Sequence, residues 1–264
     1  MNPLQLLVET ESSLDSKPAC SARICEDYMR EARLIQTSLI PSQPFRDNSV
    51  EIAFRFTPFF DVGGDFVDFF RVPDGMIGLY LGDVVGKGLP ATMYGALVMG
   101  TLRGIHKTET DTATVLSLLN QRLMQRPLPG RFCSTLYAVF DPFSCSLAFS
   151  NAGLPFPLRV SAVECQPLGQ GGLPSGLLAS ATYDQLIIQL SPGDSLLFAT
   201  DGLHESLSPA GIEFGSSRML ELWAQCHAKS AAESLDHLFE GLLAFADGTA
   251  PHDDITAIVL NVLS

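Results

Sequence analysis

Residues 66–83 read FVDFFRVPDGMIGLYLGD, and this stretch decides how the fold begins. Phe66–Val72 and Met76–Gly82 are apolar runs separated by Pro73-Asp74-Gly75, a combination typical of a tight turn. The stretch therefore predicts a β-hairpin whose second strand delivers Asp83 at its end. An aspartate placed where an apolar strand stops, beside a glycine that leaves the backbone open, is suited to holding a hard divalent cation through oxygen.

Three other segments, far apart in the chain, repeat this arrangement of an aspartate at the end of an apolar run. They are Val62-Gly63-Gly64-Asp65-Phe66, Ala199-Thr200-Asp201-Gly202 and His252-Asp253-Asp254-Ile255-Thr256. Any one of these aspartates alone would be an ordinary turn or cap residue. Together, Asp65, Asp83, Asp201 and one of Asp253 and Asp254 supply about the number of carboxylates that two Mg²⁺ or Mn²⁺ ions sharing a bridging water require. The all-oxygen donor set argues against zinc, so we expect a phosphoester hydrolase that uses metal-activated water.

Composition excludes several other classes of protein. The chain has 264 residues, 46% of them hydrophobic and 17% charged, which is enough for a large packed core. Its 29 acidic and 16 basic residues give a net charge of −13, which repels nucleic acid and anionic membrane surfaces. The six cysteines form no C-x-x-C pair, and no signal peptide or membrane span is visible. We therefore expect a cytoplasmic protein with reduced thiols that binds neither nucleic acid nor membranes.

Hydrophobic periodicity predicts the remaining elements and the fold class. Helices in pairs, rather than strict alternation of strand and helix, indicate an α+β fold with two antiparallel sheets and the helices outside them. No repeat or long linker divides residues 45–264, which we interpret as one catalytic domain. The predicted strands are 50–57, 133–140, 146–151, 156–160, 185–190, 195–200 and 255–262, and the predicted helices are 90–105, 112–125, 216–227 and 231–246, the last with a Ser230-x-x-Glu233 capping box.

Residues 1–44 are interpreted as an N-terminal extension made of a tail and an amphipathic helix. The tail, residues 1–23, is a short helix or a loose segment, and Pro41 stops the helix that follows. This helix packs on its own domain as part of the core, or it is a switch that contacts a second copy or an upstream regulator and acts on Asp65 through a short connection. Its apolar stripe consists of Ile24, Tyr28, Ala32, Ile35 and Leu39.

The order and spacing of the motifs resemble the SpoIIE/RsbU-like branch of the bacterial PPM (type-2C) serine/threonine phosphatases. The resemblance covers about residues 25–264, and no single piece of it would be specific. The matching segments are ARLIQTSLIP (32–41), FFDVGGDFVDFF (59–70), LGDVVGKGLPA (81–91), FCSTLYAVFD (132–141), NAG (151–153), FATDGLHE (198–205), EFG (213–215) and HDDITAIV (252–259).

This resemblance implies a PPM-type β-sandwich with a centre of two Mn²⁺ or Mg²⁺ ions, or three. It implies hydrolysis of phosphoserine or phosphothreonine on a regulatory protein, commonly a STAS-domain anti-anti-sigma-type factor in a partner-switching pathway. Asp83 would bridge both ions and the Val84 carbonyl would bind one of them. Asp65, Asp201 and Asp253, or Asp254 in its place, would complete the protein ligands.

The chain departs from the family pattern at two positions. Many members read D-V-S-G-H-G where this chain has Asp83-Val84-Val85-Gly86-Lys87-Gly88, and N-A-G-H-x-P where it has Asn151-Ala152-Gly153-Leu154-Pro155. Substrate docking is therefore expected to differ near Lys87 and Leu154. Lys87, His204 and His252 are the candidates for facing the phosphate. A catalytically silent binding module and a small-molecule phosphohydrolase are the alternatives to a protein phosphatase.

Overall fold

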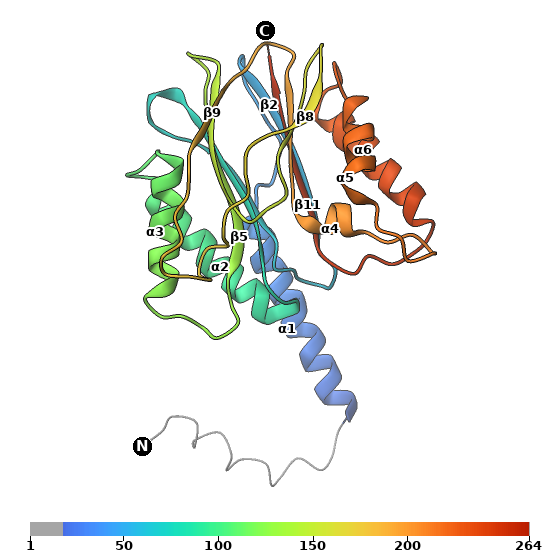
Figure 1. Ribbon diagram of the computed structural model, residues 1–264. Helices are drawn as coiled ribbons and strands as arrows, with labels where there is room; N and C mark the ends of the chain where they lie inside the picture. The colour runs from blue at the N-terminus through green and yellow to red at the C-terminus, as the bar shows by residue number, and fades with distance from the viewer. Residues whose placement is uncertain (1–17, 264) are drawn as a thin grey trace.

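The computed structural model describes residues 18–263, and its centre is a pair of stacked β-sheets (Figure 1). Helices α2 and α3 lie on one outer side of the sandwich, α5 and α6 lie on the other, and α1 extends away from it (Figure 1). The predicted α+β class with two antiparallel sheets is thereby confirmed. Among residues 18–263, no helix is both long enough and apolar enough to cross a membrane.

The first sheet has six strands in the order β1-β2-β11-β10-β7-β8, and each neighbouring pair is antiparallel. Its centre is the long pairing of β2 with β11, which places the second strand of the chain beside the last one. The strands are β1 (Phe45–Arg46), β2 (Val50–Thr57), β7 (Leu158–Val160), β8 (Cys165–Pro167), β10 (Ser195–Ala199) and β11 (Ile255–Val262).

The second sheet has five antiparallel strands in the order β3-β4-β5-β6-β9. The predicted hairpin of residues 66–83 forms β3 and β4, and a short turn at Pro73–Gly75 joins them. The strands are β3 (Phe66–Arg71), β4 (Ile77–Val84), β5 (Cys133–Asp141), β6 (Ser146–Ala152) and β9 (Leu186–Gln189).

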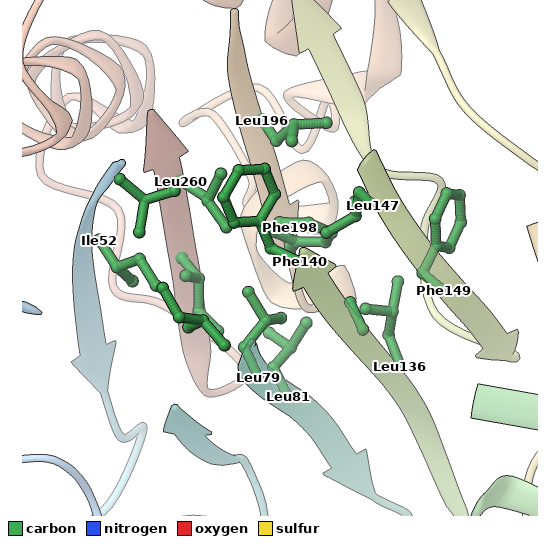
Figure 2. Close-up of a cluster of buried hydrophobic side chains, with 14 of the residues drawn as sticks. Ile52, Leu79, Leu81, Leu136, Phe140, Leu147, Phe149, Leu196, Phe198 and Leu260 are labelled. Atoms are coloured by element: carbon green, nitrogen blue, oxygen red, sulfur yellow. The ribbon is translucent and has the colours of Figure 1, made fainter. Parts of the chain in front are cut away.

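Side chains alternate between the two faces of each strand, and the apolar ones gather in three hydrophobic clusters, one between the sheets and one on each outer face. On β4, Leu79 and Leu81 point between the sheets, whereas Tyr80 points to the opposite face, under the helices. Figure 2 shows the central cluster, in which Ile52, Leu196, Phe198 and Leu260 of the first sheet meet Leu79, Leu81, Leu136, Phe140, Leu147 and Phe149 of the second. Because the central strands are buried on both faces, they read as continuous apolar runs.

The two helix pairs cover the outer faces of the sandwich. The predicted capping box of α6 is confirmed: the Ser230 Oγ accepts from the Glu233 amide at 3.2 Å, and the Ser230 amide donates to the Glu233 carboxylate at 2.9 Å. The helices are α2 (Gly88–Ile105) and α3 (Thr112–Met124) over the second sheet, and α5 (Gly215–Ala224) and α6 (Ala231–Ala246) over the first.

Helix α1 (Pro18–Leu39) begins six residues before Ile24, the first residue of the predicted stripe. The side chains of Ile24, Tyr28 and Ile35 are 48%, 66% and 62% exposed, whereas Ala32 and Leu39 are half-buried. The interpretation of this stripe as core is therefore wrong for its three largest members within the described chain. The tail was predicted over residues 1–23: residues 18–23 belong to α1, and residues 1–17 lie outside the described residues.

The C-terminal end of α1 is attached to the second sheet by a polar cluster. Arg103 of α2 donates to the carbonyl of Leu39, the last residue of α1, and its guanidinium also donates to Asp68 of β3 at 2.7 Å. A cation at the end of a helix satisfies a carbonyl that has no partner within the helix. The position of α1 on the domain is therefore set at its last turn.

Three short elements were not predicted: β1, β8 and α4 (Asp201–Glu205). Each has five residues or fewer, so none is long enough to display a helical or strand period. The last of them matters for the site, because Asp201 is the first residue of α4 rather than part of a loop after β10.

Candidate metal centre

Strand pairing brings the predicted acidic segments to one end of the sandwich. Thr57 pairs with Ile255, so the loop after β2 lies beside Asp254, which precedes β11. Ala199 pairs with Ala257 in the same sheet, which places Asp201 next to that loop. In the other sheet Asp83 pairs with Ser134 near the end of β4. Strand pairing alone therefore brings together segments that are up to about 190 residues apart in the sequence.

Asp254 holds the loop that carries Asp65. Its carboxylate is 5% exposed and accepts hydrogen bonds from the backbone amides of Phe59 at 2.6 Å, Gly64 at 2.6 Å and Asp65 at 3.3 Å. A Cβ added to Gly63 would come within 2.5 Å of the same carboxylate, so only glycine fits there. Both oxygens of Asp254 are thus used in fixing the loop, a role that its neighbour Asp253 does not have.

Asp65 and Asp83 form the buried part of the acidic cluster. The Thr200 hydroxyl donates to Asp65 at 2.8 Å, and the Asp65 side chain is 2% exposed. Burial, together with the charges of Asp83 and Asp254, raises the pKa of Asp65 well above its ordinary value. Burial and the nearby charges of Asp201, Asp253 and Asp254 raise the pKa of Asp83 to about 7. These carboxylates repel one another, and a divalent cation between them would neutralise that repulsion.

Asp253 lies at the open side of the cluster, where Lys87 contacts it. The Lys87 Nζ is 2.9 Å from Asp253 Oδ2 and also donates to the carbonyl of His252. The ammonium group lies 4.9 Å from the centre of the Phe59 ring. Lys87 therefore lies beside the cluster, and its partner in this arrangement is Asp253, a candidate metal ligand.

Gly64 brings the backbone of β4 close to the loop. A Cβ on Gly64 would lie 2.9 Å from the Val84 carbonyl oxygen and 3.5 Å from Asp83 Oδ1, so the carbonyl and the carboxylate border the same spot. Carbonyl and carboxylate oxygens are the donors that Mg²⁺ and Mn²⁺ accept. Among residues 18–263 as they stand, no group of three or more His, Cys, Asp or Glu side chains is arranged so that it could hold a metal ion. The fit rests on the type of donor alone: oxygen ligands suit hard cations, and Mg²⁺ usually keeps several waters as further ligands.

The two predicted histidines lie at the border of this cluster and contact different surroundings. His204 belongs to α4, and its Nδ1 is buried without a hydrogen-bond partner. His252 precedes Asp253, and its carbonyl accepts from Lys87. Both lie near Glu205, whose pKa is raised by burial and by the charge of Asp201. Glu205 was not singled out from the sequence, because nothing in its spacing marks it.

Gln36 is a second residue near the cluster that was not singled out from the sequence. Its side chain, on the buried face of α1, donates from Nε2 to the Gly63 carbonyl at 2.8 Å and accepts from the Gly63 amide at 3.1 Å. Thr92 of α2 donates to the same carbonyl at 2.8 Å. Helix α1 thus contacts the loop directly, two residues before Asp65. A glutamine one turn before Leu39, on the side of the half-buried residues, was the available signal.

We expect Gly202→Ala to destabilise the protein by more than about 2 kcal/mol. The added Cβ would lie 2.0 Å from the Asp254 carbonyl oxygen, a backbone atom that cannot move without displacing the start of β11. Gly100→Ala is the matched control: nothing lies within 4 Å of its Cβ, so the exposed helical glycine should gain about 0.5–1 kcal/mol. Urea unfolding of both variants measures the difference. Equal stabilities would contradict the described approach of α4 to Asp254.

Two of the curated proteins that this chain resembles come from bacteria. The protein IcfG of Synechocystis is 26% identical over 88% of this chain, and the phosphoserine phosphatase RsbU of Bacillus subtilis is 24% identical over 86%. The chain spans only 41% of the length of IcfG and 67% of the length of RsbU.

Solved structures share the fold at low sequence identity. The SiaA-PP2C domain of Pseudomonas aeruginosa superposes with a TM-score of 0.81 at 20% identity, covering 92% of this chain and 99% of that one. The catalytic domain of the serine/threonine phosphatase PstP, solved in complex with two manganese ions, superposes with a TM-score of 0.60 at 17% identity, over 82% and 99%.

A family model assigns the chain. Residues 73–263, almost three quarters of the sequence, match the model described as Stage II sporulation protein E (SpoIIE). This span contains β4 with Asp83, α4 with Asp201, and the Asp253-Asp254 pair. With the fold and the relatives in agreement, the chain belongs to the SpoIIE family, within the SpoIIE/RsbU-like branch of the bacterial PPM-type metal-dependent serine/threonine protein phosphatases.

Proposed function

We propose that this protein removes phosphate from phosphoserine or phosphothreonine of a STAS-domain regulatory protein in a bacterial partner-switching pathway. The observation that carries the proposal is the convergence of Asp65, Asp83, Asp201 and Asp253 at one end of the sandwich, around a backbone carbonyl that glycine leaves accessible. Family membership supports the chemistry, and the relative RsbU is itself a phosphoserine phosphatase.

The proposed centre holds two Mn²⁺ or Mg²⁺ ions, with Asp83 between them. The Val84 carbonyl, Asp65, Asp201 and Asp253 would complete the protein ligands. We assign Asp253 rather than Asp254 as the direct ligand, because the oxygens of Asp254 already accept three backbone amides. When bound, such ions lower the pKa of water and neutralise the charge that develops on the phosphoryl group. The solved PstP domain with two manganese ions supports this number.

The other residues of the site hold and orient these groups. Thr200 donates to the inner oxygen of Asp65 and Asp254 fixes the loop, so the carboxylates keep their positions when a substrate arrives. Lys87 is close enough to the cluster to exchange its contact with Asp253 for one with a phosphate oxygen. His204 and His252 are placed at the border, where they can donate to the substrate.

Phosphate release from a panel of phosphorylated STAS proteins, in Mn²⁺ and in chelator, tests this function. We expect metal-dependent release from at least one protein, at a higher kcat/KM than from phosphoserine or sugar phosphates. Faster hydrolysis of the small molecules would favour a small-molecule phosphohydrolase. No hydrolysis of any substrate, with retained binding of the STAS protein, would favour a binding module.

We further propose that α1 regulates this site as a dimerisation or partner-binding switch. Its outward face carries Ile24, Tyr28, Leu34 and Ile35, which are 48–66% exposed in the described chain. Its inward face carries Gln36, which contacts the loop of Asp65. A partner bound to the first face would thus move a contact of the metal-binding loop. Ile35→Asp is expected to change the oligomeric state or the metal concentration that activity requires.

Gln36→Ala is expected to raise the Mn²⁺ concentration for half-maximal activity by about tenfold or more, as loss of a group supporting a metal ligand does. The variant removes both hydrogen bonds to Gly63 but leaves Asp65 in place. Thr37→Ala, on the exposed side of the same helix turn, is the control and should behave like the wild type. A metal titration that is identical for the two variants would show that α1 does not act through Gln36.

A further inference from the structure

A cleft of about 710 Å³ opens beside the candidate metal centre. It is lined by Asp201, His204 and Glu205 of α4 on one side and by the turn between β6 and β7 on the other. Because Asp201 lines the cleft and also belongs to the acidic cluster, the cleft adjoins the place where the phosphate would be bound. A second hollow of about 680 Å³ runs along α2 and α3, but none of the candidate ligands lines it.

The base of the cleft is apolar and firmly packed. Leu154, Leu158 and Met219 line it, and each is only 4% exposed, so their side chains are held by the core beneath. Phe156 stands at the border of the cleft with 45% of its surface exposed. A fixed apolar base with one exposed aromatic ring is the usual construction of a pocket for an apolar side chain.

The turn that forms one wall is held in place before any ligand binds. The Asn151 side chain donates to the Leu154 carbonyl and accepts from the Leu154 amide, both at 2.9 Å. Gly153, between them, has φ +95°, a conformation that favours glycine. The segment Asn151-Ala152-Gly153 therefore serves to present Leu154, at the position where many family members carry histidine. The wall is apolar here because of that exchange.

The charges around the cleft select against acidic ligands. Among its lining residues in the described chain none is Lys or Arg, whereas Asp201 and Glu205 both border it. An acidic side chain would lose its hydration here without gaining a Lys or Arg partner, since the charge of the two proposed ions is already balanced by the four aspartates that would hold them. An apolar side chain would lose only unfavourable contact with water.

We propose that this cleft binds an apolar side chain adjacent in sequence to the phosphorylated residue of the substrate protein, and that it rejects an acidic side chain there. The proposal rests on the proposed phosphatase function and defines its substrate class: phosphoserine or phosphothreonine flanked by a large aliphatic or aromatic residue. The preference should be about tenfold or more in kcat/KM, which corresponds to the free energy gained by burying one leucine-sized side chain.

Phosphoserine nonapeptides that differ only in carrying Leu or Asp beside the phosphoserine, on either side in turn, test the proposal. The wild-type protein should favour the Leu peptide of one pair by about tenfold or more. Phe156→Ala should reduce that ratio at least threefold, because the exposed ring is lost. Phe143→Ala is the matched control: its ring is fully exposed in the turn between β5 and β6, at the far end of these strands, and the ratio should be unchanged.

An aryl phosphate has no flanking residue, so its hydrolysis tests the phosphatase function without testing the cleft. Hydrolysis of the aryl phosphate with equal rates for the Leu and Asp peptides would overturn the cleft assignment and leave the phosphatase function standing. Absence of all hydrolysis would overturn the function. In that case, binding of the fluorescein-labelled peptides, measured by anisotropy, decides for the cleft if the Leu peptide binds tighter and against it if the two bind equally.

Discussion

Replacing Asp83 by asparagine is expected to lower phosphate release by more than about 100-fold, since even groups that only support a metal ligand contribute 10–100-fold. The substitution keeps the shape of the side chain but removes the charge that would lie between the two ions. The fold should survive, because the pKa of Asp83, raised to about 7, shows that its charge is unfavourable in the metal-free protein. Steady-state kinetics in Mn²⁺ and circular dichroism give the two readouts.

The control for this substitution is Asp74→Asn. Asp74 is exposed in the turn between β3 and β4 and has φ 62°, a conformation that asparagine also accepts. The same chemical change at this position should leave turnover and stability near the wild-type values. If Asp83→Asn were folded and nearly as active as Asp74→Asn, the proposed role of Asp83 between the ions would be wrong.

Metal binding is expected to stabilise the protein, and more strongly at pH 8 than at pH 5.5. A ligand present at 100 times its Kd contributes about 2.7 kcal/mol to the free energy of unfolding. In chelator, the raised pKa of Asp83 means that the folded state binds its proton more tightly than the unfolded state does. That contribution to stability is present at low pH and is lost as the pH rises through about 7.

Melting curves at both pH values, in EDTA and in millimolar Mn²⁺, measure this effect. The chelated protein should lose about 2 kcal/mol of stability from this group between the two pH values, because about 1.5 pH units separate pH 5.5 from the pKa of Asp83 and each unit corresponds to about 1.4 kcal/mol. Manganese should offset the loss, since deprotonated carboxylates are the form that binds it. A stabilisation by Mn²⁺ that is equal at pH 5.5 and pH 8 would contradict the assignment of Asp83 to the metal site.

Much of the fold followed from periodicity because the central strands are long. The strands β2, β4, β5 and β11 have eight or nine residues each, and their apolar runs are bounded by turn residues such as Pro73-Asp74-Gly75. The elements that were missed, β1, β8 and α4, have between two and five residues, too few to show a period. Strands β1 and β8 pair with the adjacent strands β2 and β7, and α4 packs against β11, so each is defined by its neighbour rather than by a pattern of its own.

The candidate site was predicted at the level of residue type and not at the level of contacts. Aspartates at strand ends were recognisable, and all of them lie at one end of the sandwich. The sequence could not tell which of Asp253 and Asp254 fixes the loop and which is left free to bind a metal. That difference depends on the backbone amides of Phe59 and Gly64, about 190 residues earlier, which donate to Asp254. The contact of Gln36 with Gly63 depends likewise on how α1 docks, since its largest apolar residues point away from the domain.

The most direct test of the central claim is a crystal of the wild-type protein soaked in Mn²⁺ and measured at the manganese absorption edge. We predict two anomalous peaks on either side of the Asp83 carboxylate, within about 2.4 Å of its oxygens, with Asp253 and not Asp254 as a further ligand. Peaks elsewhere on the protein, with none near Asp83, would show that these carboxylates do not form the metal centre.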